Sequence, residues 1–508
     1  MPSRKEQPVR ALSKTKLMAF KQCRKRLWLE LHCPALREDS AATEAAFAAG
    51  NDVGKVARKL YDPADAGHLI EVRNKDFDAA FAKSAEWLNA SVPLFEAAFR
   101  AGGAMAFTDV MLPVRQGGKR AWRMVEVKST TSVKDEHRID VAIQAFIART
   151  AGVPLAAVAL AHLDSTWVYP GGGDYQGLLV ETDLTEEAFG YSDAVQQMIA
   201  AAQAVAAQSA EPDVRTGRHC DDPYECGFKN HCQSQEPQAT YPVSWLPRVQ
   251  KKALKAQIEA NGVTDLREIP DDLLNETQRR VKTHTLADSV YFNAVGAGAA
   301  LAAHPLPAYF IDFETVQFAV PIWQGTRPYQ QIPYQFSAHC LAPTGKLEHQ
   351  SFLDLSGNDP SKAFAQALIA ACSERGPVFV YNAAFERSRI EELADRFPVL
   401  KRPLFAINGR MVDLLPIARD YYYHPSQQGS WSIKKVLPAV APDLSYDALE
   451  GVQDGGMATT AYLEAIALGT APSRKVQIQQ QLLDYCGLDT QGMVRLWQFF
   501  AGRNDLVI

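Results

Sequence analysis

The chain has 508 residues, of which 47% are hydrophobic and 22% are charged, and its formal net charge is −5. These proportions are typical of a globular protein, and the length predicts two or three domains. No apolar run approaches the length of a membrane span, and no apolar block follows the basic opening stretch, so we expect a cytoplasmic protein without a membrane segment or secretory signal. The negative charge does not exclude a nucleic-acid partner, because acids gathered in a metal site can hide a basic track beside it.

Patterns along the chain divide it into three regions and predict an α/β protein. Residues 11–240 mix a helical pattern at residues 82–99 with strands at residues 104–114 and 120–130. Residues 241–303 are expected to form short amphipathic helices around a Gly-Val turn.

The third region, residues 304–508, is predicted to fold as three strands, a helix, a fourth strand and further helices. Its last segment is either a pair of amphipathic helices or one helix with a break near Gly487. An α/β layout places functional sites at the ends of strands. The predicted strands are residues 308–316, 331–341, 346–355 and 377–383, and the predicted helices are residues 360–374, 384–397 and 473–500.

Asp312 and Glu314 lie in an apolar stretch, "PAYFIDFETV", where an isolated carboxylate is costly. Side chains two residues apart on a strand point to the same face, so we expect these two carboxylates to lie together. Two like charges at close range raise a pKa unless a cation lies between them. The pattern therefore predicts a divalent metal site.

Two further stretches can complete this site. "VYNAAFERSRIEEL" places Glu386 where a strand gives way to a helix, and "DYCGLDT" places Tyr485 and Asp489 on one face of a helix. Carboxylate oxygens are the hard ligands that Mg²⁺ and Mn²⁺ prefer. Two such ions can activate a water and stabilise the leaving oxygen in a displacement at phosphorus, and the Tyr485 hydroxyl would position that water.

The series Asp-Phe-Glu, Asn-x-x-Phe-Glu and Tyr-x-x-x-Asp resembles the motifs of the DnaQ-like 3′-to-5′ exonucleases, which have an RNase H-like fold. The resemblance covers about residues 306–503 and implies an RNase H-like α/β domain with exonuclease activity. It further implies three metal-binding acids, a water-orienting tyrosine, and a glutamate where the family has aspartate. In that order, these residues are Asp312, Glu314 and Asp489, then Tyr485, then Glu386.

Two other features of this region have alternative interpretations. Asp413, in "GRMVDLLPIAR", is either a further metal ligand or a helix cap. The stretch "YYYHPSQQGSWSIKKVLP" combines aromatic rings with Lys434 and Lys435. It would contact a nucleic-acid strand by stacking and charge, or it would form a packed loop.

A second acidic set lies in the first region. Asp109 is predicted on one strand, and Glu126 and Lys128 lie two residues apart on the next, so that they share a face. Glu96 is expected in a helix upstream and Gln144 in a helix downstream. An aspartate followed by Glu-x-Lys provides metal ligands and a cation that orients water or offsets developing charge.

This second set resembles the PD-(D/E)xK, or restriction-endonuclease-like, fold and in particular its RecB-like branch. The resemblance implies that Asp109 and Glu126 are the metal-binding acids, that Lys128 is the lysine, and that Gln144 is the glutamine of the following helix. Ala148 stands where an aromatic residue is expected, and "AAGNDVGKVARKLY" contains no upstream histidine.

Three cysteines are evenly spaced in "HCDDPYECGFKNHC", more widely than in a zinc-finger pair, and an intracellular chain is not expected to form disulfides. Cys23, or alternatively Cys33, would supply a fourth thiolate, and four thiolates suit an iron-sulfur cluster. One cysteine before the nuclease core and three after it resembles the iron-sulfur RecB-like nucleases, including the CRISPR-associated ones. That resemblance implies a 4Fe-4S cluster bound by Cys23, Cys220, Cys226 and Cys232.

Two alternatives remain for these cysteines. Zinc would bind the same four residues, or three of them with His219 or His231, and the thiols would otherwise be unligated. Cys340, Cys372 and Cys486 lie in apolar or helical surroundings and are predicted to be core residues.

Together, the two halves predict a metal-dependent nuclease that hydrolyses phosphodiester bonds of DNA in preference to RNA. A RecB-like domain would be joined by the helical connector to a C-terminal 3′-to-5′ exonuclease, a combination that resembles a bacterial family of fused nucleases. The connector would contact the DNA backbone or serve as a spacer. The alternative function is that of a nucleic-acid-binding or scaffold protein in which one or both nuclease sites are inactive.

Overall fold

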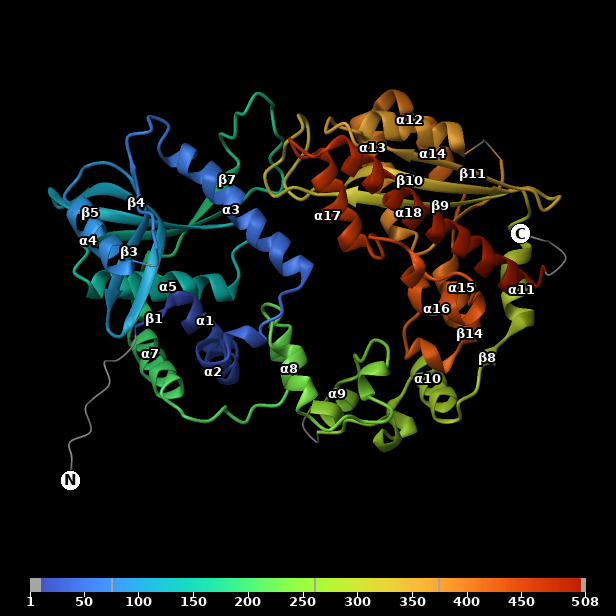
Figure 1. The fold of residues 1–508 in the computed structure, drawn as a ribbon, viewed down its shortest axis with the longest axis horizontal. Helices are drawn as coiled ribbons and strands as arrows, with labels where there is room; N and C mark the ends of the chain where they lie inside the picture. The colour runs from blue at the N-terminus through green and yellow to red at the C-terminus, as the bar shows by residue number, and fades with distance from the viewer. Residues whose placement is uncertain (1–10, 75, 260–261, 373–374, 504–508) are drawn as a thin grey trace. The chain divides into compact units, whose positions relative to one another are not determined.

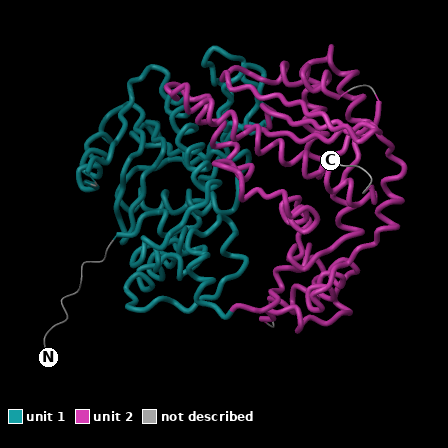
Figure 2. Tube along the Cα trace, turned by 45° about the vertical axis from the view of Figure 1, so that its right-hand side comes forward, with its two compact units in different colours: residues 1–237, 317–330 teal, residues 238–316, 331–508 magenta. Residues whose placement is uncertain are grey.

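The chain folds into two compact units, seen in a computed structural model (Figures 1 and 2). The helices and strands of both units agree with the α/β prediction. No helix among the described residues is long and apolar enough to cross a membrane. The structure describes residues 11–74, 76–259, 262–372 and 375–503, so most of the basic opening stretch lies outside them. The first unit contains residues 1–237 and 317–330, and the second contains residues 238–316 and 331–508.

The elements of the first unit are, in chain order, β1 (Leu12–Ser13), α1 (Lys14–Gln22), α2 (Arg24–His32), α3 (Ala41–Tyr61), β2 (His68–Leu69), α4 (Phe77–Trp87), β3 (Leu94–Ala101), β4 (Ala104–Gln116), β5 (Lys119–Lys128), α5 (Asp135–Thr150), β6 (Leu155–Leu163), β7 (Leu179–Asp183), α6 (Thr185–Gly190), α7 (Ser192–Ala206) and α8 (Lys229–Ser234).

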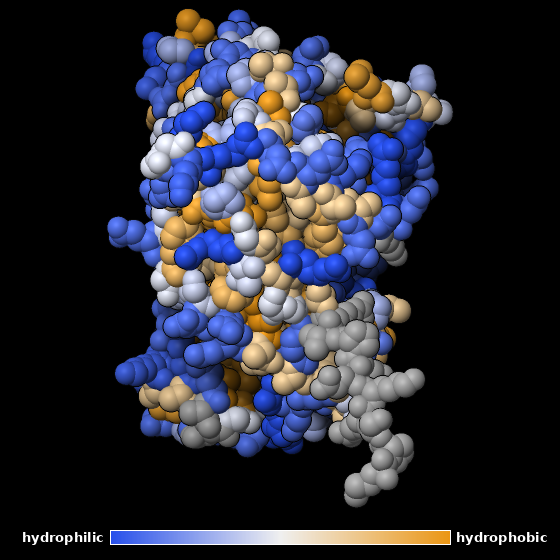
Figure 3. All heavy atoms as spheres, turned by 90° about the vertical axis from the view of Figure 1, so that its left-hand side faces the viewer, coloured by the Kyte–Doolittle hydropathy of each residue, from blue (hydrophilic) through white to orange (hydrophobic). Residues whose placement is uncertain are grey.

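A mixed seven-stranded sheet organises this unit, with β2 to β7 side by side in chain order and β1 paired with β4. β5 and β6 run parallel, and α5 makes the crossover that a parallel pair needs. Residues of α1, α2, α5 and α7 form the main core with one face of the sheet. α3 packs against residues of the other face through Val53 and Tyr61. On the side drawn in Figure 3, hydrophilic and apolar side chains are interspersed, as is usual for a protein surface.

The helix predicted over residues 82–99 is wrong in its second half. α4 ends at Trp87, and Glu96 lies in β3, with a φ of 56°. Pro93 favours an extended residue before it, and antiparallel pairing with β4 then fixes the segment as a strand. The strands predicted at residues 104–114 and 120–130 are confirmed as β4 and β5.

The elements of the second unit are α9 (Lys252–Glu259), α10 (Glu276–Leu286), β8 (Tyr291–Phe292), α11 (Ala294–Ala302), β9 (Ala308–Val316), β10 (Ile332–Leu341), β11 (Leu347–Leu353), α12 (Ser361–Ala371), β12 (Val378–Val380), α13 (Ala384–Arg396), α14 (Lys401–Asn408), β13 (Met411–Asp413), α15 (Leu414–Tyr421), β14 (Tyr422–Tyr423), α16 (Ile433–Val440), α17 (Gly455–Ile466) and α18 (Pro472–Ala501).

A five-stranded sheet in the order β11-β10-β9-β12-β13 is the centre of this unit. β9, β12 and β13 run parallel to one another, and β10 runs antiparallel to both of its neighbours, β9 and β11. α12, α13 and α14 form a core with one face, and α18 contacts β9 and β10 (Figure 1). The four predicted strands are confirmed, whereas β13 was missed because a three-residue strand carries little periodicity. α18 is one continuous helix through Gly487, so the helix pair is wrong and the break expected near Gly487 is wrong too.

Residues 241–303 pack into the second unit. β8 pairs with β14, and Thr285 and Tyr423 share a hydrogen bond of 2.7 Å between their hydroxyl groups. Arg280 donates to the carbonyl oxygen of Arg419 at 2.9 Å. Gly429 approaches the Trp245 carbonyl oxygen so closely that a Cβ on it would lie 1.6 Å from that oxygen.

We expect Gly429→Ala to lower the free energy of unfolding of the second unit by more than about 3 kcal/mol, because a φ of 76° and the Trp245 contact both exclude a side chain. Gly469→Ala is the matched control, because its φ is 95° but a Cβ there meets no atom within 4 Å. Strain alone should cost about 1–3 kcal/mol at Gly469. Urea denaturation measures both, and equal losses would contradict the close packing of the connector.

Candidate functional site

Strand β9 positions Asp312 and Glu314 on one face of the second sheet. Ile311 and Phe313 point to the opposite face, into the core with α12 and α13. Asp312 lies opposite Ser337 of β10, and a register irregularity in β10 follows near Glu314. The alternation predicted for this strand is therefore confirmed.

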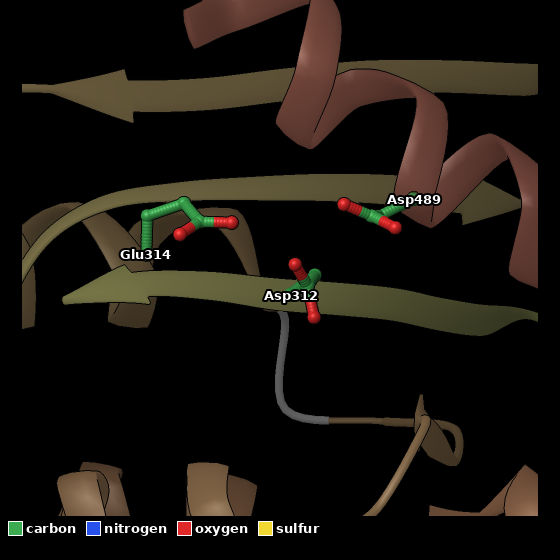
Figure 4. Close-up of side chains that lie close together, drawn as sticks. All are labelled: Asp312, Glu314 and Asp489. Carbon is green, nitrogen blue, oxygen red and sulfur yellow. The ribbon is translucent and has the colours of Figure 1, made fainter. Parts of the chain in front are cut away.

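Asp489 of α18 meets these two acids. Asp312, Glu314 and Asp489 each offer a carboxylate oxygen, and these three oxygens lie within 4.8 Å of one another. Figure 4 shows the two β9 side chains beside Asp489 of the helix. Glu314 is 9% exposed and Asp489 6%, so little water is available to screen the charges. We call these three residues the acid cluster.

Burial and mutual repulsion disfavour the ionised forms of the acid cluster. Burial, followed by the charge of Asp489, raises the pKa of Glu314 to about 8. Burial also raises the pKa of Asp489 to about 6, although a hydrogen bond from Tyr446 and the charge of Lys434 oppose the shift. The pKa of Asp312 is raised well above its ordinary value, by burial and then by Asp489. Three such oxygens fit a divalent cation, which favours the ionised forms.

Glu386 and Tyr485 lie near the cluster without belonging to it. Glu386 is 3% exposed, and its Oε2 has no hydrogen-bond partner among the described residues. Its charge contributes to the raised pKa of Asp312, and burial raises its own pKa to about 8. Tyr485 is 5% exposed, and burial followed by the charge of Asp489 raises its pKa, so the phenol is neutral.

Tyr446 is a site residue that the sequence analysis missed. Its hydroxyl donates to Asp489 Oδ1 at 2.5 Å. Lys434 Nζ lies 5.1 Å from the ring centroids of both Tyr446 and Tyr485, which is within the range of cation-π attraction. Lys434 therefore lies beside the site, whereas Lys435 is exposed. "LSYDALE" contains no signal that identifies Tyr446, because the contact joins residues 43 positions apart.

Asp413 is a cap. Its carboxylate accepts hydrogen bonds from the backbone N–H groups of Asn382, Ala383 and Leu415 at 2.9–3.0 Å. It thereby fixes the start of α15 and the turn that leads into α13, where Glu386 lies. Of the two interpretations from sequence, the structure favours the cap.

A cavity of about 640 Å³ is lined by residues that neighbour this site along the chain. They include Asn382, which has a φ of 80° and precedes the helix of Glu386, and Ile433, which precedes Lys434. Arg248 and Arg419 also line the cavity, and the guanidinium group of Arg419 pairs with Asp420 at 2.9 Å.

The first unit gathers its predicted residues around β4 and β5. The ladder that joins Val110 to Val125 continues toward Asp109 and Glu126, which line one cavity with Lys128. Asp109 Oδ2 accepts from the backbone N–H of Val127 at 2.7 Å. Burial, then the charge of Glu126, raises the pKa of Asp109 well above its ordinary value.

Two lysines bind the acids of this site. Lys128 Nζ donates to Glu126 Oε1 at 2.7 Å and to Asp140 Oδ2 at 2.5 Å. Lys14 Nζ lies 2.6 Å from the same oxygen of Glu126 and 3.3 Å from Asp140 Oδ1. Burial opposes ionisation of Glu126, but Lys128 and Lys14 outweigh it and lower the pKa. Gln144 donates to Asp140 at 3.1 Å, so it acts on the site through Asp140.

Lys14 and Asp140 are therefore further residues that the sequence analysis missed. Lys14 lies 112 positions from Glu126, and no local pattern indicates that contact. Glu96 lines the same cavity on β3, where burial and the charge of Glu126 raise its pKa. In the part of the chain that the structure describes, the acid cluster is the group that brings three candidate ligand atoms within 4.8 Å, and Asp109 and Glu126 belong to no such group.

The four predicted cysteines line one cavity of the first unit, but among the described residues no three of their sulfur atoms lie within 4.8 Å of one another. Cys23 lies between α1 and α2, Cys220 and Cys226 flank a turn, and Cys232 lies in α8. Lys25, Arg26 and His219 line the same cavity. Burial raises the pKa of the Cys232 thiol to about 11, and Lys25 opposes the shift. Buried thiols of this kind stay protonated, and binding of a metal favours their thiolate form.

Of the residues that could replace one of these cysteines, His219 lines the cavity, whereas Cys33 and His231 do not. Cys33 does not line the cavity, and it contacts the main core instead. His231 Nε2 lies 3.1 Å from Gln235 Nε2 and 3.7 Å from Glu211 Oε1. Cys372 and Cys486 are buried and Cys340 is partly buried, as core residues are expected to be.

Part of the chain matches a family of known sequences. Residues 309–432 match a family described as a domain of unknown function, DUF2779. The matched segment includes Asp312, Glu314 and Glu386 and ends before Tyr485 and Asp489. No curated protein matches the chain.

The raised carboxyl pKa values predict a pH-dependent stability of the metal-free protein. The folded-state pKa of Glu314, about 8, exceeds its ordinary value of 4.5, so its contribution is fully present below pH 4.5 and is lost as the pH rises to about 8. Glu314→Gln removes this pH-dependent loss of stability, because glutamine does not ionise. The variant should therefore gain stability relative to wild type between about pH 5 and pH 8, by up to about 1.4 kcal/mol per pH unit. Thermal unfolding in EDTA measures the difference.

Glu348→Gln is the control, because this exposed strand glutamate has a lowered pKa and stays ionised over the same range. Saturating Mg²⁺ or Mn²⁺ should raise the Tm of wild type and leave that of Glu314→Gln almost unchanged. A wild-type Tm that does not respond to either metal would count against a metal site at the acid cluster.

Proposed function

We propose that this protein is a metal-dependent nuclease that hydrolyses phosphodiester bonds of DNA, with a 3′-to-5′ exonuclease site in the second unit. The observation that carries the proposal is the acid cluster, in which carboxylate oxygens of the buried Glu314 and Asp489 and of the partly buried Asp312 lie within 4.8 Å of one another. The DnaQ-like series of motifs and the parallel strands β9, β12 and β13 support an RNase H-like fold for this unit.

The residues of the acid cluster suit this chemistry. Two divalent ions held there would activate water and stabilise the leaving oxygen in a displacement at phosphorus. Tyr485 keeps its proton, because its pKa is raised, and its hydroxyl can donate to the attacking water or to a phosphate oxygen. Tyr446 holds Asp489 in place through the 2.5 Å hydrogen bond. The nearby cavity with Arg248 and Arg419 offers cations to the phosphates of the strand.

The first unit would contribute a second nuclease site of the RecB-like type. Lys128 lies beside Glu126, as the Glu-x-Lys pattern requires, and both line a cavity with Asp109. A second function for this unit, binding of nucleic acid without cleavage, is favoured by one observation. Glu126 is already bound by two ammonium groups, which compete with a metal ion for its oxygen.

The cysteine cavity supports a 4Fe-4S cluster in the first unit. Four thiols from both ends of the unit line it, and Lys25 and Arg26 can offset the negative charge of thiolates. Such a cluster would join α1, α2 and α8 around the nuclease core. All eight cysteines are free, which suits a reducing, cytoplasmic compartment.

Digestion of end-labelled DNA and RNA with Mn²⁺ tests the nuclease activities. Wild type is expected to give a ladder that shortens from the 3′ end of DNA, and Asp312→Ala to lower the rate at least about a hundredfold. Lys128→Ala should leave this ladder intact and remove only cleavage that depends on the first unit. Glu348→Ala, on an exposed position of the second unit, is the control. If wild type binds DNA but cleaves neither polymer, the binding function replaces the proposed one.

A separate measurement tests the proposed iron-sulfur cluster. Anaerobically purified protein should be brown, with iron and acid-labile sulfide in stoichiometric amounts, and Cys220→Ser should lose both. Cys33→Ser is the matched control, because Cys33 lies outside the cavity and should retain the colour. A colourless protein that contains zinc would identify the alternative metal.

A further inference from the structure

Helix α18 is joined to the sheet of the second unit by polar contacts along one of its faces. Leu482, Cys486 and Thr490 lie four residues apart, so they follow this face from turn to turn. The Leu482 carbonyl oxygen accepts from Gln335 Nε2 at 2.7 Å, and the Cys486 thiol donates to the backbone oxygen of Asp312 at 3.7 Å. Apolar packing alone therefore does not set the place of α18 on β9 and β10.

The shortest of these contacts joins two hydroxyl groups. Thr490 Oγ1 lies 2.6 Å from Ser337 Oγ and 2.8 Å from His339 Nδ1. It also lies 3.1 Å from the carbonyl oxygen of Gly487 in its own helix. Because a carbonyl oxygen only accepts, these groups are all satisfied when Thr490 donates to it and accepts from Ser337 and His339. His349 Nε2, at 2.8 Å from Ser337 Oγ, then donates to that hydroxyl. We call Ser337, His339 and Thr490 the polar clamp.

The polar clamp lies beside the acid cluster on both of the elements that it joins. Ser337 of β10 pairs with Asp312 of β9, and Thr490 directly follows Asp489 on α18. His339 is two residues further along β10, so it points to the same face of the sheet as Ser337. The bond between the two hydroxyls therefore connects the immediate neighbours of two cluster acids.

Stability does not explain why polar groups occupy this place. Ser337 is 1% exposed, Thr490 is 0% and His339 is 8%, so all three have lost nearly all of their hydration. A buried hydrogen bond gives little net stability after that loss, and an apolar pair of the same shape would pack about as well. What hydrogen bonds add is a fixed distance and direction, because they weaken steeply away from their preferred geometry.

We infer that the polar clamp sets the spacing between Asp489 and the two acids of β9, so that its three members are positioning residues for the divalent ions of this site. They act through the acids, by holding the helix that carries one against the strands that carry the others. Groups that hold metal ligands in place commonly change metal affinity tenfold to a hundredfold. The inference rests on the proposed function, because it requires that the acid cluster bind divalent ions.

The test compares Thr490→Val with Thr490→Ser in the full chain. Valine keeps the shape of threonine and lacks its hydroxyl, whereas serine keeps the hydroxyl and lacks the methyl group. Mn²⁺ binding is measured by electron paramagnetic resonance, and the binding that Asp312→Ala removes is assigned to the acid cluster. We expect Thr490→Val to weaken this binding at least about tenfold and Thr490→Ser to stay within about threefold of wild type. A role in packing alone predicts the opposite order.

Thr285→Val is the matched control. It removes another buried bond between two hydroxyls of the same unit, the 2.7 Å contact of Thr285 with Tyr423, on elements that carry none of the three acids. This variant should lower the Tm about as much as Thr490→Val and leave Mn²⁺ binding unchanged. Ser337→Ala removes the clamp from the strand side and should weaken Mn²⁺ binding too, so the result does not depend on the folding of one variant.

The possible outcomes separate the polar clamp from the nuclease function. Equal Mn²⁺ affinity in wild type, Thr490→Val and Ser337→Ala would overturn the inference and leave the proposed function standing. Weaker binding in Thr490→Ser than in Thr490→Val would overturn it as well. A wild type that binds no Mn²⁺ at the acid cluster would overturn both. The expected order of affinities in a protein that cleaves neither DNA nor RNA would support the clamp and contradict the nuclease function.

Discussion

The second unit depends on how its buried carboxylates are neutralised. Asp312, Glu314 and Asp489 have oxygens within 4.8 Å of one another, between a sheet and the helix packed on it. Near neutral pH, burial and mutual repulsion keep part of the group protonated. A divalent cation that replaced those protons would remove the repulsion, so metal binding there would add to the stability of this unit. Tyr446 and Lys434 hold the surrounding groups in an arrangement that fits an ion.

In the first unit, lysine side chains neutralise the acids. Glu126 and Lys128 lie two residues apart on a strand, as Asp312 and Glu314 do, but one of the pair is a cation. Together with Lys14 and Asp140, they form a compact set of two positive and two negative charges. A charge-balanced set is stable without metal, which explains why the pKa of Glu126 is lowered while that of Glu314 is raised. A metal ion entering the first unit must compete with two lysines that bind Glu126 directly, whereas one entering the second meets protons and the Tyr446 hydroxyl on Asp489.

Sequence patterns predicted the parts of both sites that lie along single elements. Alternation in β9 placed Asp312 and Glu314 together, and helical spacing placed Tyr485 beside Asp489. Contacts between distant elements, such as Lys14 with Glu126, had no local signal, because packing of α1 against the sheet creates them. Glu96 was misplaced because the residues around it have helical propensity, which pairing with β4 overrides.

The two sites also differ in the helix that covers each sheet. α18 contributes Asp489 and the buried Tyr485, so the helix completes the acid cluster and its side chains fill the space above β9. α3 contributes no acid to the first site, and two of its positions there carry no side chain at all. The same layout, a strand that carries the charged groups and a helix across it, therefore gives a cluster of acids in one unit and a charge-balanced set beside an open cavity in the other.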